Sequence, residues 1–250
     1  MNNVIIVAGG KGLRMGSELP KQFIPIGGKR ILMHTIETFY NFDNNIKIIL
    51  VLPASHQEYW DKLCKNHKFR IPHEIATGGE TRFHSVKNGL ALVKEGLVAV
   101  QDGVRPFGSK EMIKRCFDAA NIYPAVIPVI GSSDSLREIL DSGKSKIVDR
   151  SKIRLIQTPQ VFHSDILKKA YESEYKDVFT DDASVVEEMG IDIHLVEGEL
   201  TNIKITTPLD LRIGKLICEK FSTNSTKKNH LLKRLLLKVV YVMKKITGRA

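Results

Sequence analysis

Runs of apolar, β-branched residues alternate along the first half of the chain with segments whose apolar residues recur at helical spacing. The apolar runs cover residues 4–8, 46–52 and 97–101. Between them, residues 31–40, 57–66 and the stretch after Ser85 carry apolar side chains three and four positions apart. Apolar strands that alternate with amphipathic helices are typical of a parallel sheet covered on both faces. We therefore predict a doubly wound α/β fold with a mostly parallel, Rossmann-like sheet.

The second half continues the pattern but interrupts it once. We predict strands at residues 125–130 and 193–196 and helices at 183–189 and 210–221. Residues 132–149 are polar and turn-rich, with two short extended pieces around Ser142-Gly143. They predict a projecting β-arm, at about 132–150. We expect one domain over residues 1–222, arm included, because a chain of this length forms one large core more readily than two small ones.

The charge of the chain is unevenly distributed. The net charge of +10 suggests an acidic partner, but residues 223–250 hold eight Lys or Arg and no acid, which leaves 30 basic against 28 acidic residues in the body. A nearly neutral body predicts no nucleic-acid partner. The three cysteines, Cys64, Cys116 and Cys218, lack metal-ligand spacing, and Met1 leads into the first strand without a signal-peptide pattern. We expect a soluble, cytoplasmic protein with free thiols.

A glycine-rich loop follows the first predicted strand. It spans residues 8–16, Ala-Gly-Gly-Lys-Gly-Leu-Arg-Met-Gly, and Pro20-Lys21-Gln22 comes after it. Glycines let backbone N–H groups approach phosphates, and the cations of Arg14 and Lys21 can neutralise phosphate charge. The spacing matches neither the Walker loop nor the dinucleotide fingerprint. A structural turn is the alternative for the glycines alone, and the cations that follow favour phosphate binding.

Two further segments carry candidate chemistry at element ends. Residues 78–86, Gly-Gly-Glu-Thr-Arg-Phe-His-Ser-Val, precede a predicted helix, where backbone amides and Ser85 can recognise a base edge. The alternative for this segment is a capped helix start. Asp102 follows a buried strand, at the edge where open α/β sheets bind ligands, and is placed to hold Mg²⁺ between phosphates. The alternative for Arg105 is a plain ion pair with Asp102.

Polar groups also stand at element ends in three later segments, each of which alone is typical of a cap or turn. They are residues 157–162 (Gln-Thr-Pro-Gln-Val-Phe), 180–184 (Thr-Asp-Asp-Ala-Ser) and 202–208 (Asn-Ile-Lys-Ile-Thr-Thr-Pro). With all these motifs in this order, residues 4–221 resemble the 2-C-methyl-D-erythritol 4-phosphate cytidylyltransferase family. The resemblance implies a homodimeric, Mg²⁺-dependent enzyme that transfers CMP from CTP to a sugar-alcohol phosphate in non-mevalonate isoprenoid biosynthesis.

The resemblance also implies roles for individual residues. Catalytic charges would come from Arg14, Lys21 and Lys204. CTP would be bound by Ala8, Gly9, Gly10, Gly12, Gly16, Gly78, Arg82 and Ser85. Asp102 would coordinate Mg²⁺ and position the acceptor, which would be held by Arg105, Thr158, Thr180 and Lys204, with Ser135 and Arg150 reaching across from a partner's arm. The chain departs from the family pattern at Ser135, Gln101 and Arg154, where Thr, His and an aromatic residue are usual.

Two alternatives stay open at this point. The ribitol-5-phosphate cytidylyltransferases share nearly every motif quoted, including Gly9-Gly10 in place of Ala-Gly, so ribitol 5-phosphate is the alternative acceptor. A non-catalytic nucleotide-binding or membrane-tethered module is the alternative of a different class. The presence together of Arg14, Lys21, Asp102 and Lys204 argues against it, because binding alone would not need all four.

The chemistry implied is an in-line attack by an acceptor phosphate oxygen on the α-phosphorus of CTP. Two anions must be brought together, so the protein has to supply positive charge rather than a nucleophile. The acceptor phosphate is already ionised and needs no general base, and we expect His34, His84 and His194 to be structural.

The tail at residues 223–250 begins within a linker at 222–226. Placed on a helix, its aliphatic residues share one broad face and most of its basic residues gather on the other, with Leu237 as an exception. A basic amphipathic helix of this kind predicts peripheral contact with an anionic membrane. The alternatives are a helix docked on the body and a disordered tail.

Overall fold

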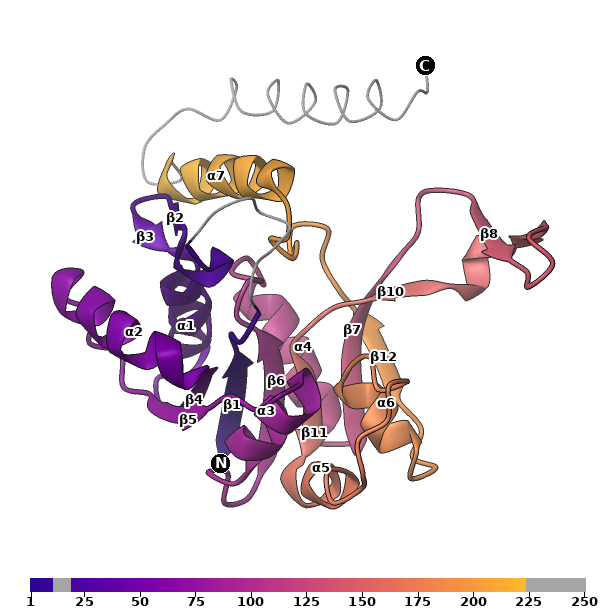
Figure 1. Cartoon of the computed structure of the whole chain (residues 1–250), viewed down its shortest axis with the longest axis horizontal. Helices are drawn as coiled ribbons and strands as arrows, with labels where there is room; N and C mark the ends of the chain where they lie inside the picture. The colour runs from indigo at the N-terminus through magenta and orange to yellow at the C-terminus, as the bar shows by residue number, and fades with distance from the viewer. Residues whose placement is uncertain (11–18, 224–250) are drawn as a thin grey trace.

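The computed structural model describes residues 1–10 and 19–223 and has an eight-stranded central sheet (Figure 1). The strand order is β10-β7-β11-β6-β1-β4-β5, with β12 paired to β7 off this path. The strands are β1 (Asn2–Val7), β4 (Lys47–Leu52), β5 (Glu74–Thr77), β6 (Leu97–Asp102), β7 (Ala125–Gly131), β10 (Arg154–Ile156), β11 (Gln160–His163) and β12 (His194–Glu197). Five of them coincide, within a residue or two, with strands that the sequence predicts.

The sheet is mostly parallel, as predicted. β6, β1, β4 and β5 pair in parallel, and so do β7 and β12. The exceptions are β11, which lies antiparallel between β6 and β7, and β10, which pairs antiparallel with β7. The apolar pattern of the sequence did not predict β5, β10 or β11, because each is short and only partly apolar.

Helices cover both faces of the sheet, which confirms the doubly wound architecture. Successive side chains of a strand point to opposite faces, so Val4 and Ile6 of β1 join one core while Ile5 joins the other. The first core packs against α1 (Ile31–Phe42), α2 (Ala54–Asn66) and α4 (Lys110–Ala120). The second packs against α3 (Arg82–Leu90), α5 (Ser164–Ala170) and α6 (Asp182–Glu187).

The helix-start signals in the sequence are confirmed at two places. At α6, the Asp181 carboxylate accepts from Ser184 N and the Ser184 hydroxyl faces Asp181 N, which forms a capping box. At α7 (Pro208–Thr223), Asp210 Oδ2 accepts from the backbone N–H groups of Thr206 and Thr207. These caps fix the segments that run along the carboxyl edge of the sheet.

A small cluster lies over the carboxyl ends of the central strands. It is formed by the short hairpin of β2 (Pro25–Ile26) and β3 (Lys29–Arg30), the start of α1, and α7. Ile26, Ile31, Phe107, Ile205 and Cys218 pack together there.

Burial raises the pKa of the Cys218 thiol, and that of Cys116 to about 12. All three cysteines are free thiols, as predicted.

A separate hairpin projects beyond the sheet in the segment where the sequence predicts an arm (Figure 1). It consists of β8 (Leu136–Ile139) and β9 (Ser145–Val148), and a short turn, η3 (Arg150–Lys152), leads back to β10. Ile139 and Ile147 on this hairpin are 73% and 76% exposed. An arm with so little core of its own offers its apolar side chains to solvent or to another surface.

Within the described residues, no helix is long and apolar enough to cross a membrane.

Candidate active site

A cleft of about 280 Å³ lies at the carboxyl ends of β1 and β6 and gathers most of the predicted nucleotide-site residues. Its lining includes the predicted residues Ala8, Gly9, Gly10, Lys21, Gly78, Arg82, Ser85, Asp102 and Lys204. These positions come from five segments of the chain. The sheet brings them together because parallel strands deliver their following loops to the same edge.

The first side of the cleft follows β1. Ala8 is held from two directions, since its N–H donates to Val51 O at 3.0 Å and its carbonyl accepts from Gln22 Nε2 at 2.7 Å. Lys21 begins a short 3-10 turn, η2 (Lys21–Phe23), and a Cβ on Gly10 would lie 3.6 Å from Lys21 Cε. The remaining predicted members of this loop, Gly12, Arg14 and Gly16, lie outside the described residues.

The second side is the loop between β5 and α3. The capped helix start is confirmed, because the Thr81 side chain accepts from His84 N. Ser85 holds the glycine turn, its Oγ accepting from Gly79 N at 3.0 Å. A Cβ on Gly79 would come within 2.4 Å of His84 Cβ, so the close turn requires glycine here. The start of α3, with Arg82 and Ser85, lines the cleft together with Gly78 and Gly79.

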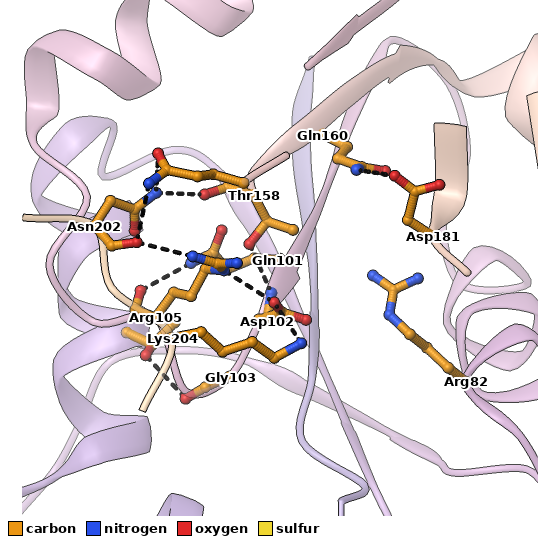
Figure 2. A network of polar contacts seen from close by, with 12 residues as sticks. Arg82, Gln101, Asp102, Gly103, Arg105, Thr158, Gln160, Asp181, Asn202 and Lys204 are labelled. Atoms are coloured by element: carbon orange, nitrogen blue, oxygen red, sulfur yellow. Dashed lines mark hydrogen bonds and ion pairs between the residues drawn. The ribbon is translucent and has the colours of Figure 1, made fainter. Parts of the chain in front are cut away.

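Asp102 is a buried carboxylate of the cleft and lies among cations. Its Oδ2 is 3.0 Å from Lys204 Nζ and 3.0 Å from Arg105 Nε. In Figure 2, Arg105 lies to the left of Asp102, Arg82 lies to its right, and the Lys204 side chain ends beneath it. Burial alone would raise the pKa of Asp102, but Lys204, Arg82 and Arg105 outweigh it and lower the pKa. The carboxylate is therefore ionised at neutral pH.

Arg82 is positioned by groups that the sequence did not single out. Its Nη2 lies 2.6 Å from Oδ2 of Asp182, a carboxylate with no exposed surface. Oδ1 of the same carboxylate accepts from Tyr171 OH at 2.7 Å. Gln160 completes the arrangement, since its Oε1 accepts from Asp182 N at 3.1 Å and its Nε2 donates to Asp181 Oδ2 at 2.8 Å. Asp182 and Gln160 stand in segments that are typical of a cap and a turn. The sequence pattern gives no sign that these two segments contact each other or Arg82.

The predicted acceptor residues other than Lys204 lie in three places. Thr158 and Arg105 lie beside Asp102: Thr158 Oγ1 accepts from Asp102 N at 3.1 Å, and Arg105 Nε is 3.0 Å from Asp102 Oδ2. Thr180 is exposed and immediately precedes the cap of α6. Ser135 and Arg150 belong to the projecting arm, where Arg150 Nη1 donates to Ser133 O at 2.6 Å.

The three histidines considered from the sequence make contacts within the fold. Nε2 of His34 donates to Ile26 O at 2.8 Å, and His194 stacks on Tyr123 with ring centroids 3.6 Å apart. His84 lies at the start of α3, where its Nδ1 is 2.9 Å from Thr81 Oγ1. Of the family departures, Gln101 is buried and its Nε2 donates to Arg105 O at 2.9 Å, which places it behind the site.

The charges of the cleft suit a ligand with several phosphates. Three cations, Lys21, Arg82 and Lys204, line the cavity. Its described lining has two carboxylates, Asp102 and Glu80. Among the described residues, no group of three or more His, Cys, Asp or Glu side chains could hold a metal ion. Mg²⁺ is commonly bound by one or two carboxylates together with substrate phosphates and water. Both ion pairs of Asp102 end on Oδ2, so its second oxygen fits that manner of binding.

Comparison with known proteins gives one consistent result. The family model described as 2-C-methyl-D-erythritol 4-phosphate cytidylyltransferase matches residues 2–220. A protein of that name from Bacteroides thetaiotaomicron is 58% identical over 216 residues, which are 86% of this chain and 98% of that protein. One from Bacteroides fragilis is 59% identical over 214 residues, 85% of this chain and 97% of that protein.

Solved structures agree with the sequence relatives. The 4-diphosphocytidyl-2C-methyl-D-erythritol synthase of Anaerococcus prevotii matches with a TM-score of 0.74 and 31% identity, over 87% of this chain and 95% of that one. The 2-C-methyl-D-erythritol 4-phosphate cytidylyltransferase of Thermus thermophilus matches with a TM-score of 0.71 and 29% identity, over 88% of this chain and 100% of that one.

Proposed function

The chain belongs to the 2-C-methyl-D-erythritol 4-phosphate cytidylyltransferase family, a family of nucleotidyltransferase enzymes, and we propose that it moves CMP from CTP onto 2-C-methyl-D-erythritol 4-phosphate. The products are 4-CDP-2-C-methyl-D-erythritol and pyrophosphate. The observation that carries this proposal is the cleft that Lys21, Arg82, Lys204 and Asp102 line together. Ribitol 5-phosphate is not favoured as the acceptor, because the family and its near relatives carry the methylerythritol name.

In the proposed reaction an acceptor phosphate oxygen attacks the α-phosphorus of CTP, and pyrophosphate leaves from the opposite side. The new P–O bond forms as the bond to pyrophosphate breaks, and no proton has to move because the attacking oxygen is already ionised. Lys21 and Lys204, with Arg14, stabilise the negative charge that gathers on the transferring phosphoryl group. Preorganised cations act strongly there because they need not reorient during the reaction.

Nucleotide binding is assigned to the two loops on either side of the cleft. The backbone N–H groups of the loop that contains Ala8, Gly9, Gly10, Gly12 and Gly16 bind the triphosphate. Gly78 and Ser85 recognise the cytosine edge, since the loop they form is rigid and presents short polar groups. Arg82, at the positive end of α3, adds charge beside them.

Asp102 is the proposed ligand of a magnesium ion. Its oxygen Oδ1 would contact the ion, while Oδ2 keeps its ion pairs with Lys204 and Arg105. A bound Mg²⁺ neutralises phosphate charge and orients the triphosphate. The low pKa of Asp102 keeps the carboxylate ionised for this role.

Acceptor binding is assigned to residues of two subunits. Arg105, Thr158, Thr180 and Lys204 hold the acceptor from within one chain, and Ser135 and Arg150 of the partner subunit complete the site. Support for a homodimer comes from the projecting hairpin with its exposed Ile139 and Ile147. Burying such side chains against a second copy would remove apolar surface from water.

The tail is assigned separately, because the family match ends at residue 220. Residues 224–250 lie outside the described residues. From the sequence of residues 223–250, with eight basic and no acidic residues beside clustered aliphatic ones, we propose peripheral contact with an anionic membrane surface.

The proposed reaction is tested by measuring pyrophosphate release from each nucleoside triphosphate with methylerythritol phosphate or ribitol phosphate, with and without Mg²⁺. We expect release only with CTP, methylerythritol phosphate and Mg²⁺ together. Faster turnover with ribitol phosphate would refute the acceptor, and activity that is unchanged by removal of divalent metal would refute the metal assignment.

A further inference from the structure

Lys204 lies in a segment without regular secondary structure. Between the end of β12 at Glu197 and the start of α7 at Pro208, residues 202–206 belong to no helix or strand. In a strand or a helix, regular backbone hydrogen bonds fix the position from which a side chain projects. Here the direction of Lys204 depends on whatever holds the segment in place.

Asn202 anchors this segment and has no exposed surface. Its Nδ2 donates to Thr158 O at 2.9 Å and lies 3.3 Å from Gln157 Oε1. Its backbone carbonyl accepts from Arg105 Nη1 at 2.9 Å (Figure 2). Asn202 therefore joins the Lys204 segment to Thr158 and to the arginine that pairs with Asp102.

Two more anchors act on either side of Asn202. The side-chain amide of Gln157 pairs with the backbone of Glu199, with Nε2 donating to Glu199 O at 2.8 Å and Oε1 accepting from Glu199 N at 3.1 Å. On the other side, Ile205 N donates to Val104 O at 2.9 Å. Lys204 thus stands between Asn202 and Ile205, two positions that are both fully buried.

The buried Asn202 side chain lowers the stability of the fold relative to an apolar side chain in the same space. Its Oδ1 is buried and, among the described residues, has no hydrogen-bond partner. A buried polar atom without a partner costs stability, and an apolar side chain would avoid the cost. What an apolar side chain cannot do is donate to Thr158 O and so hold the segment at one distance from Asp102.

We propose that Asn202 is a positioning residue for Lys204: it holds the ammonium group beside Asp102 and the reacting phosphates without touching the substrate itself. The inference rests on the role of Lys204 in the proposed function. Displacing a catalytic group by about 1 Å can cost about 10²-fold in rate. A lost anchor should therefore appear in kcat, while the KM for CTP changes little.

The test is a double-mutant cycle of Asn202→Ala and Lys204→Ala, with kcat and the KM for CTP measured from pyrophosphate release. We expect Asn202→Ala to lower kcat at least about 10-fold when Lys204 is present and less than about 2-fold in the Lys204→Ala protein. The matched control is Asn121→Ala, which removes a hydrogen bond from Asn121 Nδ2 to Phe117 O at the end of α4, and it should leave kcat unchanged.

An equal loss of kcat in both backgrounds would overturn the inference, because Asn202 would then act through something other than Lys204. So would an unchanged kcat in folded Asn202→Ala. If the Lys204→Ala single variant keeps normal turnover, the proposed catalytic role of Lys204 fails. That result is read from the single variant alone and is therefore distinguishable from the effect of Asn202→Ala in the two backgrounds. Should Asn202→Ala not fold, Gln157→Met in the same cycle removes the neighbouring anchor at Glu199 and is held to the same two outcomes.

Discussion

Arg82 and Asp182 are 100 positions apart in the sequence, and their side chains form an ion pair of 2.6 Å at the side of the cleft. The pair joins the first residue of α3 to the first residue of α6. Burial alone would lower the pKa of Arg82, but the Asp182 carboxylate raises it above its usual range. Burial, and then the same carboxylate, raise the pKa of Tyr171, whose hydroxyl stays protonated and donates to Asp182.

Breaking this pair from one side should be more damaging than removing both charges. Arg82→Met leaves the Asp182 carboxylate buried without its cation, and we expect the free energy of unfolding to fall by about 3 kcal/mol, at the low end for a buried pair because the Arg82 side chain is 30% exposed. Adding Asp182→Asn should restore part of this loss, as measured by urea unfolding. CTP binding should be weaker than in wild type in both variants, because both lack the Arg82 charge. A double variant less stable than Arg82→Met would contradict this account.

Lys21→Ala and Lys204→Ala should each lower kcat by about 10²-fold or more with the fold intact, because their charges act mainly on the transition state. The measurement is steady-state pyrophosphate release, with circular dichroism to verify folding. Lys65→Ala is the matched control, since Lys65 is exposed on α2 and pairs only with Asp61 among the interactions described. Near-normal turnover in either folded site variant would remove that lysine from the mechanism.

Asp102 should stabilise the folded chain most at neutral pH. Its pKa is lowered in the folded state, so its contribution is complete above the unfolded pKa of about 3.9 and is lost as the pH falls through the folded pKa. The difference in unfolding free energy between wild type and Asp102→Asn should be constant from pH 8 to 5 and shrink only below about pH 4. A difference that changed between pH 7 and 5 would mean that burial dominates and the pKa is raised.

The arm is tested by complementation between subunits. If Arg150 serves the partner subunit's site, inactive Arg150→Ala and inactive Lys21→Ala chains should regain some activity when mixed. In a mixed dimer, one of the two sites would have both residues intact. Mass spectrometry of tagged chains should establish that subunits exchange. Proven exchange without any recovered activity would count against the arm proposal.

The tail is tested by truncation. A chain that ends after Ser222 keeps every proposed site residue, so its kcat should match the full-length value. Binding to vesicles of anionic lipid should be lost, because each basic residue near such a surface contributes about 1 kcal/mol. Sedimentation with neutral vesicles gives the control. Equal anionic-vesicle binding by both chains at low salt would refute the membrane proposal.

The fold was largely predictable because its signals are local. The apolar runs of β1, β4 and β6 and the helical spacing of α1 and α2 are visible within windows of a few residues. The antiparallel insertion of β11 between β6 and β7 was not, since β11 has only four residues and its partners are far away in the sequence. A short strand is specified by the neighbours that it pairs with more than by its own composition.

The sequence by itself determined the class of fold, the catalytic family and the segments that form the cleft, because glycines, charges and strand ends stand in a fixed order along the chain. Only the tertiary structure decided how those segments hold one another. The ion pair of Arg82 with Asp182 and the hydrogen bond from Asn202 to Thr158 join positions 100 and 44 residues apart. Such partners leave no periodic signal in the sequence, because the sheet that brings them together is built from the whole chain.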